Sequence, residues 1–152
     1  MQISQKCSVA IHCLIFLREY GDLRNVTSGL LARSTGCNPV IIRSTISSLR
    51  KAGIVTVKPG IGNIRLAKTP EEITLLDLCD ALEPSCFRRL MGVHPHPSPL
   101  CPVGRNIRQV LEQPYQKIQA DLRASLGSIS LEEILAIYHR TSAGEPPPEG
   151  GL

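Results

Sequence analysis

Cationic side chains and short hydroxyls are concentrated in one stretch, residues 38–68, which contains six Lys or Arg and no Asp or Glu. Its first half reads Asn-Pro-Val-Ile-Ile-Arg-Ser-Thr-Ile-Ser-Ser-Leu-Arg-Lys. Guanidinium groups hydrogen-bond phosphate oxygens and the guanine edge, and serine hydroxyls can approach either one closely. The chemistry that these residues can perform is therefore the binding of a polyanion.

Six cysteines are the second group with chemical potential: Cys7, Cys13, Cys37, Cys79, Cys86 and Cys101. Their irregular spacing favours thiols over a disulfide framework. Cys101 lies at the start of an expected helix, whose dipole favours a thiolate, and Arg105 adds positive charge nearby. Cys37 directly precedes the cap of another helix. We expect Cys37, Cys101 and Cys86 to be the redox-sensing candidates, although small buried side chains are the alternative.

The basic stretch is preceded by two expected helices. Apolar residues at helical spacing predict a helix over residues 4–20, with Cys7, Cys13 and His12 as core or interface residues. Thr27 or Ser28 can cap a second, short helix that ends near Gly36.

The basic stretch itself predicts a helix followed by a hairpin. Asn38 caps this helix, Pro39 opens it and Gly53 ends it. Ile42, Ile46 and Leu49 recur on one face and are expected to meet the core. Two short apolar runs, 54–57 and 64–67, flank a Pro/Gly/Asn turn. The residues expected to face DNA are Ser28, Arg33, Asn38, Val40, Arg43, Ser44, Ser47, Arg50, Lys51, Lys58 and Arg65.

The second half of the chain predicts more helices and a proline-rich loop. Thr69 or Thr74 caps a fourth helix, and Pro102 opens a long helix with an apolar stripe that ends at Leu126. Pro114 should kink or split the long helix. Ser130 and Glu133 form a capping box for a last helix over 131–138. The resulting division is 1–82 winged helix-turn-helix domain, 83–101 proline-rich sensor loop, 102–140 dimerisation helices and 141–152 disordered tail.

The distribution of charged residues also divides the chain into two parts. Residues 1–68 hold ten basic and two acidic side chains, a balance of +8, whereas the remainder holds seven and eleven, a balance of −4. A basic half joined to an acidic half predicts a polyanion-binding domain carried by a region with another task.

The apolar run 7–17 lacks a cleavage site and is too short to span a bilayer. We expect a cytoplasmic protein without a membrane partner.

The order of these elements resembles the Rrf-two family of bacterial winged helix-turn-helix transcription regulators, which includes the iron-sulfur cluster regulator, the nitric-oxide-sensitive repressor and the cysteine-metabolism repressor. The motifs that carry the resemblance are residues 41–55, 60–67, 70–77 and 101–107. The resemblance implies a mainly α fold with a small β-hairpin. It also implies a repressor that binds a partly palindromic operator in double-stranded DNA as a homodimer, joined through residues 102–126. Its half-sites would lie about 34 Å apart.

The chain departs from this family at the cofactor site. Cluster-binding members carry three closely spaced cysteines before the long helix, whereas this loop offers Cys86 and Cys101. His94 and His96 could complete a mixed site for an iron–sulfur cluster or zinc. We favour no cofactor, and sensing through a cluster or metal stays an alternative.

The sequence contains no catalytic triad, carboxylate pair or phosphate loop, so we do not expect an enzyme. A winged-helix module that binds an acidic protein is the second alternative.

Overall fold

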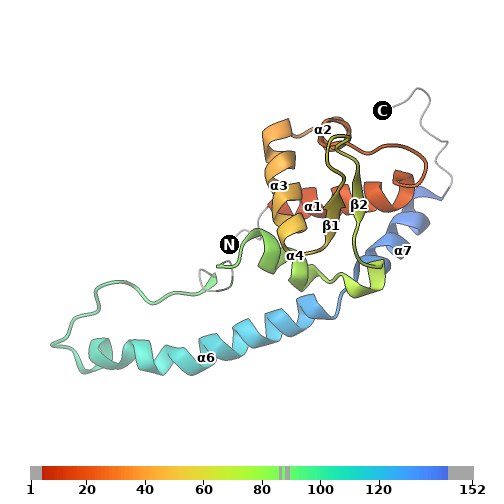
Figure 1. Cartoon of the computed structure of the whole chain (residues 1–152). Helices are drawn as coiled ribbons and strands as arrows, with labels where there is room; N and C mark the ends of the chain where they lie inside the picture. Colours follow the sequence, from red (N-terminus) through yellow and green to blue (C-terminus); the bar gives the residue numbers. More distant parts are fainter. Residues whose placement is uncertain (1–4, 86, 88–89, 144–152) are drawn as a thin grey trace.

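A long helix, α6 (Pro102–Gly127), extends away from a body formed by the other elements in the computed structural model, which describes residues 5–85, 87 and 90–143 (Figure 1). The elements of the body are α1 (Gln5–Tyr20), α2 (Ser28–Thr35), α3 (Pro39–Lys51), β1 (Val55–Val57), β2 (Ile64–Leu66), the 3-10 helix η1 (Pro70–Glu72), α4 (Leu75–Leu82) and α7 (Leu131–Ser142). The predicted fold class, mainly α with a small β-hairpin, is confirmed.

Local capping determines where α2 and α3 begin and end. The Thr27 hydroxyl accepts a hydrogen bond from the backbone N–H of Leu30 at 3.3 Å, and Gly36, at φ +67°, ends α2. Asn38 Oδ1 accepts from the N–H of Val40 at 2.8 Å, and Pro39 occupies the first turn of α3, where its missing N–H costs nothing. These caps fix a short turn between the two helices, as the sequence predicts.

The antiparallel hairpin pairs Val55 with Leu66 and Val57 with Ile64. It is attached to the loop between α1 and α2 on one side. The Ile64 N–H donates to the Val26 carbonyl at 2.8 Å, and the Val26 N–H donates to Asn63 Oδ1 at 3.2 Å. The hairpin therefore has a fixed base, which two strands alone would not provide.

The core lies between α1, α2, α3 and the hairpin, and α7 completes it. Leu131 and Leu135 of α7 are each 1% exposed and belong to the same apolar cluster as Leu14 of α1. The Leu131 N–H also donates to the Ile73 carbonyl at 2.7 Å. Helix α7, which the sequence groups with the dimerisation helices, therefore also packs on the body of its own chain.

Three expectations for the second half are corrected. Pro114 does not split α6, which runs through it without a break (Figure 1). Pro114 is exposed and so is Val110, whose carbonyl loses its N–H donor, so water can satisfy that carbonyl. The last helix continues to Ser142, and residues 144–152 lie outside the described part. Phe87 and Leu90 are helical within the segment expected to be a loop.

None of the helices in the described part of the chain is long and apolar enough to cross a membrane.

Candidate nucleic-acid interface

Helix α3 buries one side against the core and exposes the other side to solvent, as the sequence predicts. Ile42 and Leu49 are fully buried and Ile46 is 5% exposed. Thr45, which the sequence did not single out, is also buried. Val40, Arg43, Ser44, Arg50 and Lys51 are exposed on the helix, and Ser47 is half-buried. The exposed side therefore presents three cations, two serine hydroxyls and the apolar Val40, and it has no carboxylate.

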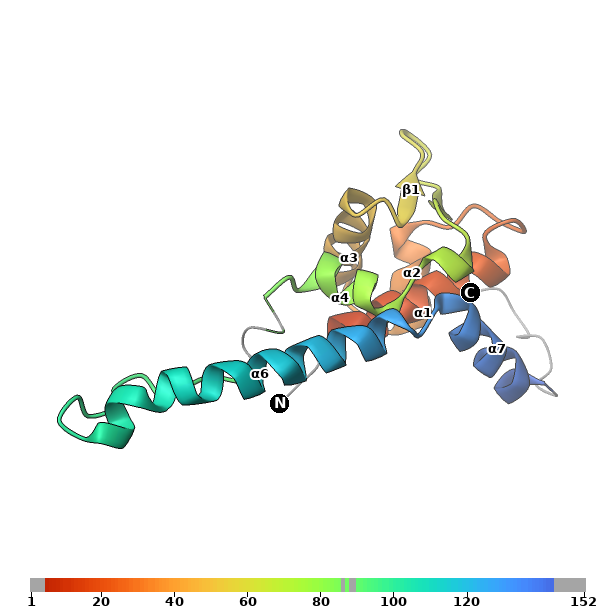
Figure 2. The ribbon, with the colours of Figure 1, turned by 90° about the horizontal axis from the view of Figure 1, so that it is seen from below.

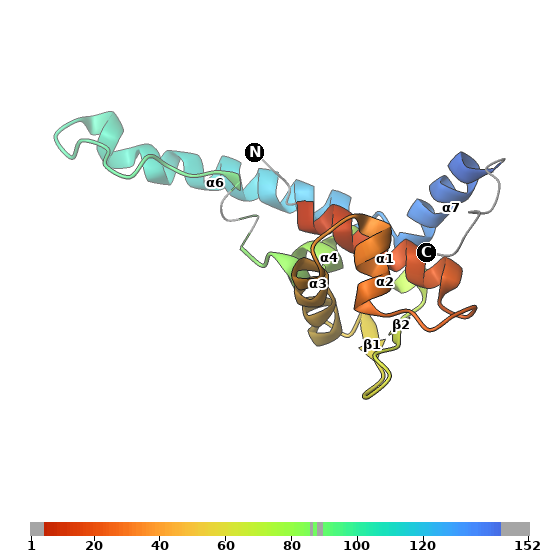
Figure 3. The same cartoon turned by 90° about the horizontal axis from the view of Figure 1, so that it is seen from above.

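The hairpin projects from the body on the same side as α3, and α6 lies on the opposite side (Figures 2 and 3). Gly60 and Gly62 have φ values of +80° and +67°, which allow a tight tip, and Lys58 is exposed beside it. Ile61 at the tip is 57% exposed. A helix flanked by such a hairpin can enter one groove of a duplex while the hairpin reaches the neighbouring backbone.

Arg65 differs from the other predicted DNA contacts, because its side chain is turned toward the body. Its Nη1–H donates to the Arg24 carbonyl at 3.3 Å, in the loop between α1 and α2. A guanidinium has five N–H donors, so others stay available for a phosphate. Together with Asn63, Arg65 holds the hairpin to the loop. The sequence marked Asn63 only as a turn residue, because its bond to Val26 joins residues 37 positions apart.

The remaining predicted contacts come from the start and end of α2 and the cap of α3. Ser28 is the first residue of α2 and is half-buried, and Arg33 is exposed in its last turn. Asn38 uses its side-chain oxygen as the helix cap, which leaves its amide N–H groups for a phosphate. The structure thus brings α3 and the hairpin together on one face, with the start of α2 beside the base of the hairpin, whereas the last turn of α2 contacts α1 through Ser34 and His12.

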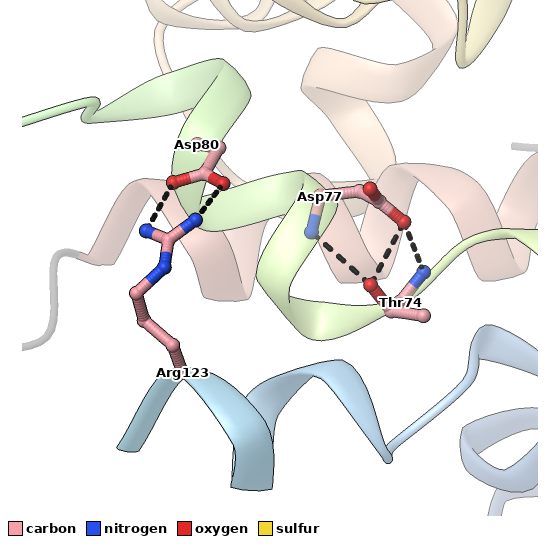
Figure 4. Close-up of polar contacts among 4 residues, drawn as sticks. All are labelled: Thr74, Asp77, Asp80 and Arg123. Carbon is pink, nitrogen blue, oxygen red and sulfur yellow. Dashed lines mark hydrogen bonds and ion pairs between the residues drawn. The ribbon is translucent and has the colours of Figure 1, made fainter. Parts of the chain in front are cut away.

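Behind α3, the fourth helix joins the recognition side to α6. The Thr74 and Asp77 side chains form a capping box at its start (Figure 4). Asp80 accepts two hydrogen bonds from the Arg123 guanidinium of α6, at 3.0 and 2.8 Å (Figure 4). The same guanidinium lies 4.9 Å from the ring centroid of Phe87. Helix α4 therefore packs against both α3 and α6.

Comparison with known proteins identifies the family to which this chain belongs. Residues 3–137 match the Rrf2 family, described as iron-dependent transcriptional regulators. The chain belongs to the Rrf2 family. It is 33% identical over 133 residues to YwnA of Bacillus subtilis strain 168, named as an HTH-type transcriptional regulator, with 88% of this chain and 96% of YwnA covered.

One solved structure supports the same assignment of this Rrf2 protein, and a second shares its fold. One, described as a DNA-binding protein, is 30% identical, with a TM-score of 0.67 and coverage of 86% of this chain and 98% of the other. The second is CymR, the global cysteine regulator of B. subtilis, which is 18% identical with a TM-score of 0.63. The match covers 90% of this chain and 98% of CymR, and the two proteins share the fold. The chain is a DNA-binding transcription regulator, and the family is not one of enzymes.

The predicted sensing thiols of this Rrf2 protein are far apart. Cys37 is half-buried in the turn before α3, with its Sγ 3.7 Å from the Thr35 carbonyl oxygen. Cys101 is exposed at the N-cap of α6, the end most distant from the body (Figure 1). Within one chain they cannot form a disulfide without rearrangement. Cys86 lies outside the described residues. Cys13 is fully buried, and burial, followed by nearby Cys37, raises its pKa to about 12.

The described residues do not fit an iron–sulfur cluster or another metal. They contain no group of three His, Cys, Asp or Glu side chains placed to hold an ion. His94, His96 and Cys101 are each exposed and do not converge. A cluster needs several thiolate or imidazole ligands around it, and the described part of this chain does not supply them.

Proposed function

We propose that this Rrf2 regulator is a repressor that binds a partly palindromic operator as a homodimer. The observation that carries the proposal is the face formed by α3 and the hairpin, on which every charged side chain between residues 38 and 68 is a cation. Such a face attracts the phosphate backbone and leaves the short hydroxyls close to the bases. A cytoplasmic location agrees with this role.

We assign different tasks to the exposed residues. The 13 residues of α3 span about 20 Å, which suits insertion into a major groove about 12 Å wide. Arg43, Ser44 and Ser47 lie along the helix and would read base edges. Arg50 and Lys51 in the last turn would bind phosphates. The phosphate contacts at the flanks would come from Ser28, Arg33, Asn38, Lys58 and the remaining donors of Arg65. Val40 would make an apolar contact with a thymine methyl group.

The proposed dimer rests on the apolar surface of α6. This helix has 26 residues and none of them is buried. Val103, Val110 and Ile118 are 69%, 62% and 41% exposed, whereas Leu122 and Leu126 pack on the body. An isolated helix with this much exposed apolar surface is poorly stable in water. A second copy that covers residues 102–126 would bury it and place two α3 helices at one operator.

The test is selection of binding sites from a pool of random double-stranded DNA. We expect enrichment of a two-fold symmetric sequence with half-sites about one helical turn apart. Analytical ultracentrifugation should give twice the mass of the chain, and Val110→Glu should give a monomer with weaker operator binding. No enrichment at low salt would contradict DNA recognition and favour the protein-interaction alternative.

For the signal, we propose thiol chemistry in preference to a cluster. Cys101 is exposed at a helix N-terminus and Cys37 precedes the cap of α3, so a disulfide between them would have to join two subunits. A visible absorption band in protein purified without oxygen would contradict this preference. Operator affinity that does not change after replacement of Cys37 and Cys101 by Ser, in reduced and oxidised protein, would remove these two residues from the signal.

A further inference from the structure

Two other cysteines, distant in sequence, are in contact inside the body. Cys7 of α1 and Cys79 of α4 have their Sγ atoms 3.7 Å apart, although they are separated by 72 positions. They are 9% and 5% exposed. The sequence treated Cys7 as a core residue and did not pair it with Cys79. A disulfide needs an S–S distance of about 2.05 Å, so the two sulfurs would have to approach by about 1.7 Å.

This pair lies where α1, α4 and α6 meet. Cys7, Cys79 and Phe87 form a small apolar cluster, against which Leu122 and Leu126 of α6 pack. Both cysteines line a cavity of about 420 Å³, in which Ile11 and Leu75 are among the apolar walls and Gln5 and Ser8 are the polar ones. This cavity would be the route by which a small reagent approaches the pair.

We propose that Cys7 and Cys79 are a redox-active dithiol that a low-molecular-weight disulfide oxidises to a Cys7–Cys79 disulfide. One thiol loses its proton and attacks a sulfur of the reagent, which breaks the S–S bond and expels one thiolate. The second thiol then attacks the mixed disulfide and expels the other thiolate. Two protein thiols give up two electrons and two protons, and the reagent leaves as two thiols.

The environment of the pair determines its kinetics. Burial, followed by the neighbouring Cys7 thiol, raises the pKa of Cys79 to about 12. The thiolate fraction at neutral pH is therefore small and the exchange is slow in both directions. The reaction accelerates as the pH rises, and the disulfide, once formed, persists after the reagent is removed.

Through α4, the disulfide would affect both the proposed DNA-binding helix α3 and the proposed dimerisation helix α6. This helix packs against α3, and Asp80, the residue after Cys79, holds Arg123 of α6. Pulling α4 toward α1 therefore changes how α3 and α6 are held. This consequence rests on the proposed operator binding, whereas formation of the disulfide does not.

The experiment uses the full chain with Cys13→Ala and Cys86→Ser, so that the tryptic peptides of Cys7 and Cys79 carry one cysteine each. The protein is equilibrated at pH 8.5 with mixtures of oxidised and reduced glutathione, approached from both directions. It is then alkylated with N-ethylmaleimide, digested and analysed by mass spectrometry. We expect a cross-linked pair of peptides, 7–18 with 69–88, which disappears in Cys7→Ser and persists in Cys37→Ser. Circular dichroism checks that each variant is folded.

Full alkylation of Cys7 and Cys79 at the most oxidising ratio would overturn the proposal, as would stable mixed disulfides with glutathione at these positions. Affinity for the selected operator is measured on the same samples, and oxidation should change it at least threefold, an effect that Cys79→Ala abolishes. A cross-link with unchanged affinity would overturn the coupling to α3. A cross-link in a chain that binds no DNA in either state would instead contradict the proposed function.

Discussion

Replacing Arg50 by Ala should reduce the salt dependence of operator binding by a defined amount. Arg33, Arg50, Lys51, Lys58 and Arg65 are the cations of the proposed face to which we assign phosphate contacts. If each neutralises one phosphate, a dimer has about ten such contacts, and the slope of log K against log[salt] is about −9. Removing Arg50 from both subunits leaves about eight contacts and a slope of about −7.2. Raising KCl from 50 to 200 mM should then weaken binding about 10⁴-fold instead of about 10⁵-fold.

Fluorescence anisotropy with the selected duplex, measured at several KCl concentrations, gives both slopes. Arg140→Ala is the matched control, because Arg140 is an exposed arginine near the end of α7, away from α3. The Arg50 variant should also lose similar affinity on specific and random duplexes, since phosphate contacts carry no sequence information. An unchanged slope for Arg50→Ala, or an equal reduction for Arg140→Ala, would refute the assignment of this face.

Three further predictions concern stability. Leu135→Ala should lower the free energy of unfolding in urea by about 2–5 kcal/mol, whereas Ile137→Ala, at a position 54% exposed, should change it by less than about 0.5 kcal/mol. The pKa of Cys13 is raised by folding, so its stabilising effect is complete below pH 9 and lost as the pH rises towards 12. Between these values Cys13 should lower stability by about 1.4 kcal/mol per pH unit, and Cys79, whose pKa is raised in the same direction, should add to this slope. Cys13→Ala should therefore reduce the slope under reducing conditions without abolishing it. Pro114→Ala restores one backbone donor and should raise the midpoint of thermal unfolding of α6, followed by circular dichroism, with no change of operator specificity.

The elements that could be predicted from sequence are those fixed by local interactions. Asn38 and Pro39 mark the start of α3 because a cap and a first-turn proline act within a few residues. The alternation of Ile42, Ile46 and Leu49 with polar residues likewise specifies which side of α3 is buried. The Ser130 capping box of α7 follows the same logic, with Glu133 three residues later.

The features that escaped prediction depend on distant parts of the chain. The contact between Cys7 and Cys79, the bond from Arg65 to Arg24 and the packing of Leu135 on the core all join residues whose proximity only the tertiary fold creates. The disruption of α6 by Pro114 was overestimated for a related reason. A helix with intact hydrogen bonds on both sides tolerates one missing donor when the affected carbonyl faces water.

The position of α7 has a consequence for how the chain is made. Leu131 and Leu135 complete the core that holds α1 and α3, and His139 Nε2 is hydrogen-bonded to the Glu19 carboxylate at 2.8 Å, so the last helix contacts the first. A nascent chain therefore cannot finish its DNA-reading body until α7 has left the ribosome. We expect an mRNA truncated after the codons of α6 to yield a chain that does not fold and is degraded. Such a chain would not form inactive dimers with the full-length protein at the operator.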